Sequence, residues 1–159
     1  MSTYTATISW KRNGEVFTDN RYSRAHEWSF DGGVTLRASS SPAVVPRFSD
    51  PSGVDPEEAF VASLSSCHML TFLLLAAAKK FTVDSYVDEA LGTLAKNARG
   101  KLAMTEVVLR PRVVFTGDAQ PSAEALKELH HRAHEECFIA NSVTTNVRCE
   151  PVLSSEAGE

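Results

Sequence analysis

Alternation of apolar and polar residues predicts β-strands in both halves of the chain. The alternating segments are residues 4–10, 26–30, 34–38, 82–96, 102–115 and 142–151. Turn sequences separate several of them: Asn-Gly at 13–14, Asp-Gly-Gly at 31–33 and Asn-Ala-Arg-Gly-Lys at 97–101. Short strands joined by such turns favour hairpins, so we expect antiparallel pairing.

The first predicted helix begins at Asp55. An aspartate can cap the helix, Pro56 suits the first turn, and the acidic residue Glu57 is favoured there by the helix dipole. Residues 60–81 are nearly all apolar, which indicates burial on most sides rather than along one stripe. Serines at 63, 65 and 66 compete for backbone groups, so we expect a break and a new helix beginning near Cys67.

A second helix is predicted over residues 121–138, starting at Pro121 or Ser122, with apolar residues at the helical period. The order strands, helix, strands, helix, strand indicates an α+β fold with an antiparallel sheet, a long buried central helix and a second helix. We expect one domain over residues 1–159, with 155–159 as a frayed tail. A small domain cannot cover a helix that is apolar all round, so a dimer that buries it is the simpler arrangement.

Composition narrows the functional classes. The chain has 159 residues, 43% of them hydrophobic, and a net charge of −4 with scattered basic residues, so we expect neither a nucleic-acid nor a membrane partner. The apolar run 69–78 is about half the length that spans a bilayer. The first residues lack the pattern of a secretion signal, so we expect a cytoplasmic protein. Its three cysteines would then be packed, metal-bound or reactive.

Cys67 has two interpretations. A cysteine in an apolar environment is often buried and inert, whereas a thiol at a helix N-terminus near a guanidinium ionises readily and becomes a nucleophile. Cys137 lies at the end of the second predicted helix. If the two met, they would form a dithiol able to close a disulfide during turnover. Cys149 lies in an alternating strand, and we expect it to be packed.

The histidines offer a rival site. His130, His134 and Cys137 share one helix face, and imidazole with thiolate suits zinc or copper. Only three ligands can be identified, and no paired-cysteine motif accompanies them, so we expect a solvated helix face and no metal or cofactor. We interpret His68 as a core histidine; the alternative is that it tunes Cys67 by hydrogen bonding.

Two segments resemble the OsmC/Ohr family, the osmotically inducible and organic hydroperoxide resistance proteins. The first is "RFSDPSGVDPEEAFVASLSSCHML" at 47–70, in which Asp-Pro-Glu is followed, ten residues after Glu57, by Cys67 ahead of an apolar stretch. The second is "HEECFIANSV" at 134–143, with Cys137 near the end of a helix. The order of predicted elements is similar too, so the resemblance covers nearly the whole chain.

The resemblance implies a thiol peroxidase that reduces organic hydroperoxides, built as an intertwined homodimer with two sites at the subunit interface. By position, Cys67 would be the peroxidatic cysteine, Cys137 the resolving cysteine, and Glu57 the carboxylate that holds a catalytic arginine. The reductant would be a dithiol, with a lipoylated protein favoured over thioredoxin. The alternative function is a non-enzymatic module that binds an apolar ligand or a metal at the dimer interface.

The two branches of the family supply the arginine from different segments. Arg47 matches the OsmC position and Arg24 lies near the Ohr position. We favour Arg24, because Arg47 lies in a proline-containing loop. The sequence also departs from the family: Phe138 stands where proline usually follows the resolving cysteine, and His68 stands where an aromatic or apolar residue is common. The branch therefore stays open.

Overall fold

The computed structural model describes residues 1–152. The chain divides into two compact units, Met1–Ala59 and Phe60–Glu159, and each is described by itself. The frayed tail expected at 155–159 lies outside the described residues.

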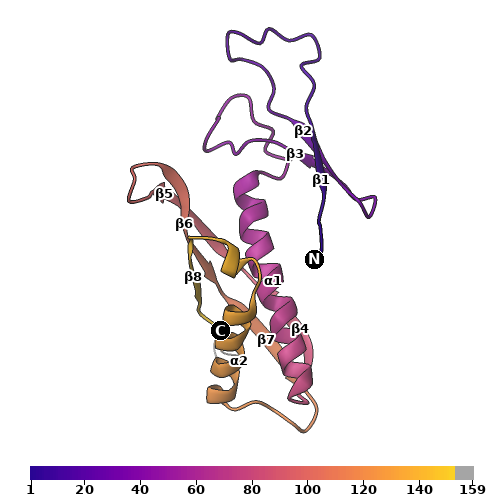
Figure 1. Cartoon of the computed structure of the whole chain (residues 1–159), viewed down its shortest axis with the longest axis vertical. Coiled ribbons are helices and arrows are strands. Elements are labelled where there is room, and N and C mark those ends of the chain that lie inside the picture. The colour runs from indigo at the N-terminus through magenta and orange to yellow at the C-terminus, as the bar shows by residue number, and fades with distance from the viewer. Residues whose placement is uncertain (153–159) are drawn as a thin grey trace, which may run out of the picture. The chain divides into compact units, whose positions relative to one another are not determined.

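The first unit contains a three-stranded antiparallel sheet. Its strands are β1 (Ala6–Ser9), β2 (His26–Phe30) and β3 (Thr35–Ala38), in that order across the sheet (Figure 1). The predicted β2–β3 hairpin is confirmed, with Trp28 opposite Leu36. The Asn13-Gly14 turn forms with positive φ at both residues. β1 is an edge strand of an antiparallel pair, as expected, but its partner β2 follows after a long connection rather than directly after this turn. The residues beyond that turn instead contribute Phe17 and Tyr22 to an aromatic cluster with Trp10.

Helix α1 (Pro56–Ala78) begins as the sequence predicts. Asp55 Oδ1 accepts the backbone N–H of Glu58 at 2.8 Å, and Glu58 Oε2 accepts the backbone N–H of Asp55 at 3.2 Å. This reciprocal cap satisfies two backbone donors at the helix start.

The break predicted at the serines is wrong. Helix α1 runs unbroken for 23 residues, because Ser63 Oγ donates to the Phe60 carbonyl at 2.8 Å and Ser65 Oγ donates to Asp88 without displacing the helical ladder. Cys67 therefore lies in the interior of a helix rather than at its N-terminus.

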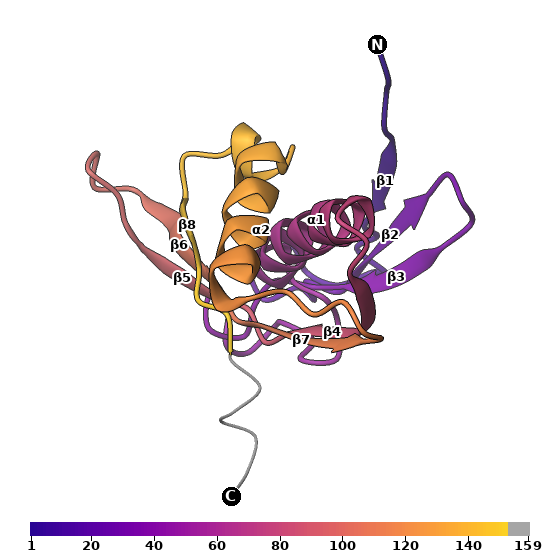
Figure 2. The same cartoon turned by 90° about the horizontal axis from the view of Figure 1, so that it is seen from below.

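Within residues 60–152, the second unit holds five strands. They are β4 (Thr82–Asp88), β5 (Leu91–Lys96), β6 (Leu102–Leu109), β7 (Pro111–Thr116) and β8 (Asn146–Cys149). The turn at 97–101 joins β5 and β6 as expected. The predicted hairpin of residues 82–96 with 102–115 forms only between β5 and β6. β4 pairs with β7 instead, and β8 lies parallel to β6 (Figure 2).

Helix α2 (Ala123–Glu136) packs on α1. Ser122 is its N-cap, with Oγ accepting the N–H of Ala125 at 3.1 Å, and a short 3₁₀ helix (Ala140–Ser142) follows α2. One buried cluster joins Phe72 and Ala76 of α1 to Leu129 and Ala133 of α2. A second contains Leu64, Val107 and Leu109. The α+β class with two helices and antiparallel sheets is confirmed.

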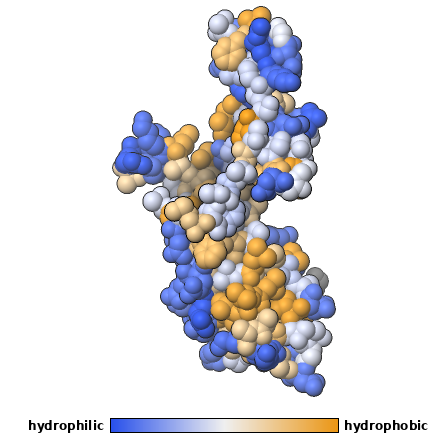
Figure 3. All heavy atoms as spheres, turned by 45° about the vertical axis from the view of Figure 1, so that its right-hand side comes forward, coloured by the Kyte–Doolittle hydropathy of each residue, from blue (hydrophilic) through white to orange (hydrophobic). Residues whose placement is uncertain are grey.

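Helix α1 buries one stripe within the chain. The fully buried side chains are Leu64, His68, Phe72 and Ala76, spaced four residues apart, rather than residues on most sides as expected. Leu70 and Leu74 are 61% and 70% exposed, and apolar side chains gather on one face of the second unit (Figure 3). By length and composition alone α1 could cross a membrane, a property that it shares with core helices of soluble proteins.

Candidate functional site

Two of the predicted site residues lie in the second unit. Cys67 is a partly buried residue of α1, and its carbonyl accepts the Thr71 hydroxyl at 2.9 Å. Cys137 is the C-terminal capping residue of α2 and only 1% exposed. Its Sγ accepts the backbone N–H of Ala140 at 3.4 Å. Asn141 donates to the carbonyls of Glu135 and Cys137, which fixes the turn that carries this thiol.

The structure brings these two cysteines together. Burial first, and then the nearby Cys67 side chain, raise the pKa of Cys137 to about 11. Cys137 therefore stays an S–H group at neutral pH. Both are free thiols. A thiol held against a second thiol is the arrangement that thiol–disulfide chemistry requires.

Arg24 lies in the first unit, held by its own loop. Its Nη1 donates to the Tyr22 carbonyl and its Nη2 to Asn20 Oδ1 at 2.7 Å, and the guanidinium lies 3.6 Å from the centroid of the Tyr22 ring. It lines an apolar cavity of about 500 Å³ together with Trp10 and Phe17. The guanidinium is thus fixed in a largely aromatic environment.

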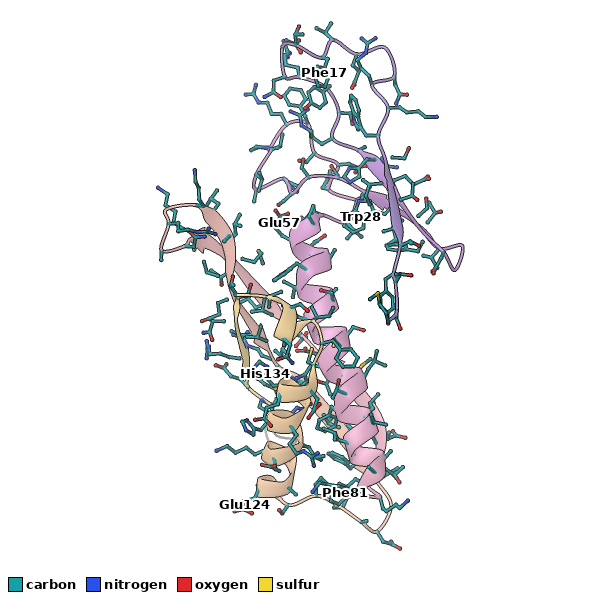
Figure 4. The ribbon with its side chains drawn as sticks, in the orientation of Figure 1. Phe17, Trp28, Glu57, Phe81, Glu124 and His134 are labelled. Atoms are coloured by element: carbon teal, nitrogen blue, oxygen red, sulfur yellow. The ribbon has the colours of Figure 1, made fainter. Side chains whose placement is uncertain are left out.

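Glu57 and Arg47 also belong to the first unit. Glu57 lies in the first turn of α1 (Figure 4). It is half-buried, whereas Arg47 is exposed. Within residues 1–59, Glu57 forms no ion pair with Arg24 or Arg47. The predicted carboxylate–arginine clamp is not formed there, and the roles of these three residues stay predictions.

A second group of chemically active side chains occurs in the second unit, and sequence reasoning missed it. His68 Nε2 lies 3.1 Å from His130 Nδ1 and 3.7 Å from Cys149 Sγ. Burial lowers the pKa of His68 to about 4 and that of His130 to about 3, so both imidazoles are neutral at pH 7. Burial raises the pKa of Cys149 to about 12.

This cluster differs from the helix face that the sequence suggested. His130 turns to His68 and Cys149, rather than forming a ligand set with His134 and Cys137. His68 hydrogen-bonds to His130, and within residues 1–152 it has no hydrogen bond to Cys67. No local sequence pattern indicates this cluster, because 62 residues separate His68 from His130 and 81 separate it from Cys149.

The model of the OsmC family, described as OsmC-like protein, matches residues 49–151. The chain belongs to the OsmC-like protein family. An OsmC-like protein of unknown function from Vibrio cholerae is 56% identical, with a TM-score of 0.94 over 96% of this chain and 100% of that one. The resemblance to this family seen in the sequence is confirmed.

More distant solved structures share the fold. An organic hydroperoxide resistance protein from Elizabethkingia anophelis is 18% identical, with a TM-score of 0.68 over 95% of this chain and 94% of that one. The organic hydroperoxide resistance protein OhrB of Bacillus subtilis is 20% identical, with a TM-score of 0.67 over 95% and 98% of the two chains. No curated protein matches the sequence.

Proposed function

We propose that this protein is a cytoplasmic thiol peroxidase that reduces organic hydroperoxides. The observation that carries the proposal is that the Cys137 thiol lies close enough to the Cys67 side chain for Cys67 to raise its pKa. Membership of the OsmC-like family supports it, as do the names of the two distant relatives, which are organic hydroperoxide resistance proteins.

In the proposed cycle, the Cys67 thiolate attacks the terminal oxygen of the hydroperoxide. The O–O bond breaks, the alcohol leaves after taking up a proton, and Cys67 becomes a sulfenic acid. Cys137 then attacks the Cys67 sulfur, and water leaves as the disulfide forms. An external dithiol reduces this disulfide to two thiols and is itself oxidised. The reductant we propose is of the lipoyl type.

The contact between the two thiols suits the second step of the cycle. Cys137 lies at the end of α2, in a turn rather than inside a helix, so its backbone can shift to bring the sulfurs to bonding distance. The neutral S–H form of Cys137 also keeps it from competing with Cys67 for the peroxide, since the thiolate is the nucleophile.

A guanidinium would complete the site. Arginine donates hydrogen bonds to peroxide oxygens in a fixed planar geometry, and a carboxylate holds that geometry. We propose Arg24 for this role and Glu57 as the carboxylate that holds it. The order of the loop around Arg24 supports this choice over the exposed Arg47.

The proposed assembly is a homodimer with two sites at the subunit interface. Leu70 and Leu74 leave an apolar strip on α1 that the chain does not bury, and a second copy would cover it.

A peroxide-consumption assay tests the function. The parent protein, Cys67→Ser and Ser63→Ala would each be given cumene hydroperoxide with dihydrolipoamide as reductant. We expect consumption by the parent and by Ser63→Ala, which changes an exposed serine of the same helix, and none above background by Cys67→Ser. Equal consumption by Cys67→Ser would contradict the assignment of Cys67, and consumption by the parent at the background rate would favour the non-enzymatic binding module.

A further inference from the structure

Three side chains that the proposed peroxidase does not use converge inside the second unit. They are His68 of α1, His130 of α2 and Cys149 of β8, and their potential ligand atoms all lie within 4.8 Å of one another. Each comes from a different element, so the folded unit, rather than one local motif, assembles the group.

Packing alone does not account for the two histidines. His68 is 1% exposed and His130 is 3% exposed, with rings stacked at 7° to one another. Within residues 1–152 their outer nitrogens, His68 Nδ1 and His130 Nε2, have no hydrogen-bond partner. Burying polar nitrogens without partners costs free energy that an apolar pair of similar size would avoid. The cluster therefore indicates a chemical role.

Two of the three separations fit ligands to one ion. Typical bond lengths of about 2.05 Å to nitrogen and about 2.3 Å to sulfur convert the 3.1 Å N–N and 3.7 Å N–S separations into angles of about 100° and about 115° at a shared metal. The first angle is somewhat below the tetrahedral value, and the second lies between the tetrahedral and trigonal values. The ligand atoms of His130 and Cys149 lie within 4.8 Å of each other and would draw together to about 4.4 Å or less when both bind the ion. The hydrogen bond between the two rings would be exchanged for two metal–nitrogen bonds.

Charge and ligand type select the ion. Two neutral imidazoles and one thiolate are soft donors that suit copper and zinc. A monovalent ion with one thiolate leaves the buried group neutral, whereas a divalent ion would leave a net positive charge in an apolar interior. Three protein ligands also fall short of the four that structural zinc sites use.

We propose that His68 Nε2, His130 Nδ1 and Cys149 Sγ bind one monovalent copper ion. Binding releases one proton, from the Cys149 thiol. The hydrogen shared between the rings moves to an outer nitrogen, so each imidazole stays neutral and presents an inner lone pair. No electron is transferred. A cavity of about 140 Å³ reaches His130, with Phe115 and Val152 also in its wall.

The test measures copper binding without any peroxidase readout. Cys67→Ser serves as the parent, because it removes the Cys67/Cys137 dithiol as a competing site. Cuprous ion would be titrated under anaerobic conditions against the chromophoric chelator bicinchoninate. We expect one equivalent bound, and X-ray absorption should show one sulfur and two imidazole nitrogens at the copper.

Two variants in the same background locate the site. Cys149→Ser and His130→Gln should each weaken the affinity by more than about 100-fold, since loss of a ligand costs more than loss of an outer-shell contact. His131→Ala, on the same helix but exposed, should bind as the parent does. Near-UV circular dichroism of the metal-free proteins checks their folding. If only one of the two ligand variants folds, the affinity of that variant decides the test. Unchanged affinity in that variant, no copper bound by the parent, or retention of zinc but not copper would each overturn the proposal.

Discussion

The thiol of Cys137, at the end of α2, lies close to Cys67 in the middle of α1, although 70 residues separate them in the sequence. This proximity is the structural basis of the proposed peroxidase. The helix N-terminus that the sequence suggested for activating Cys67 is not available to it, because α1 does not start at that cysteine. In the proposed cycle, activation of Cys67 depends on the arginine.

Removal of Arg24 should therefore slow the reaction with peroxide. We expect Arg24→Ala to lower kcat/KM for cumene hydroperoxide by about 30- to 1,000-fold, or 2–4 kcal/mol, the effect of losing a charged transition-state contact. Arg47→Ala is the matched control and should change it little. If kcat/KM fell in Arg47→Ala and stayed normal in Arg24→Ala, the catalytic arginine would be Arg47, as in the OsmC pattern.

Mixed dimers decide whether the site is shared between subunits. We expect Arg24→Ala and Cys67→Ser chains, each inactive by itself, to regain activity when mixed, because one hybrid site would then hold both an intact arginine and an intact cysteine. The measurement is peroxide consumption after the two chains have exchanged. A mixture as inactive as its components would place the whole site within one chain.

The dimer itself is tested at the exposed strip of α1. Leu74→Glu changes a side chain that is 70% exposed in the single chain, so the fold should survive while a charge in the proposed interface opposes association. Sedimentation equilibrium should show a dimer for the parent and a monomer for the variant. Lys127→Glu, exposed on α2, is the control for adding a carboxylate and should remain dimeric. A dimeric Leu74→Glu would rule out this face.

The pKa of Cys137 predicts how stability depends on alkaline pH. Its folded value is raised from 9.0 to about 11, so below pH 9 the thiol is protonated in both states and its stabilising contribution is complete. Between pH 9 and 11 the unfolded chain loses the proton first. The free energy of unfolding should then fall by roughly 1–3 kcal/mol more than in Cys137→Ala, measured by urea denaturation. Parallel pH profiles of the two proteins would contradict the shift.

Local signals in the sequence predict part of the fold. The capping of α1 by Asp55 and the turn between β2 and β3 depend on residues a few positions apart, and both form as expected. The serines do not interrupt α1 as predicted. The hydroxyl of Ser63 donates to the Phe60 carbonyl and that of Ser65 to Asp88, and the backbone hydrogen bonds of the helix stay in place. Pairing of β4 with β7 joins distant segments, which a pattern of alternation does not specify.

The candidate site was likewise predictable from the sequence only in part. Spacing and family resemblance point to Cys67 and Cys137, and the structure places these two thiols close together. The meeting of His68 with His130 and Cys149 depends on how α2 and β8 pack in three dimensions, so no local pattern predicts it.

Treatment of the reduced protein with one equivalent of cumene hydroperoxide, followed by mass spectrometry, tests the central claim most directly. We predict a single intramolecular disulfide between Cys67 and Cys137 and one equivalent of the alcohol. In Cys137→Ser, Cys67 should instead stop at sulfenic acid and proceed to sulfinic acid with excess peroxide. A parent protein that yields sulfenic or sulfinic acid at Cys67 without the disulfide, or that leaves both cysteines reduced, would contradict the proposed cycle.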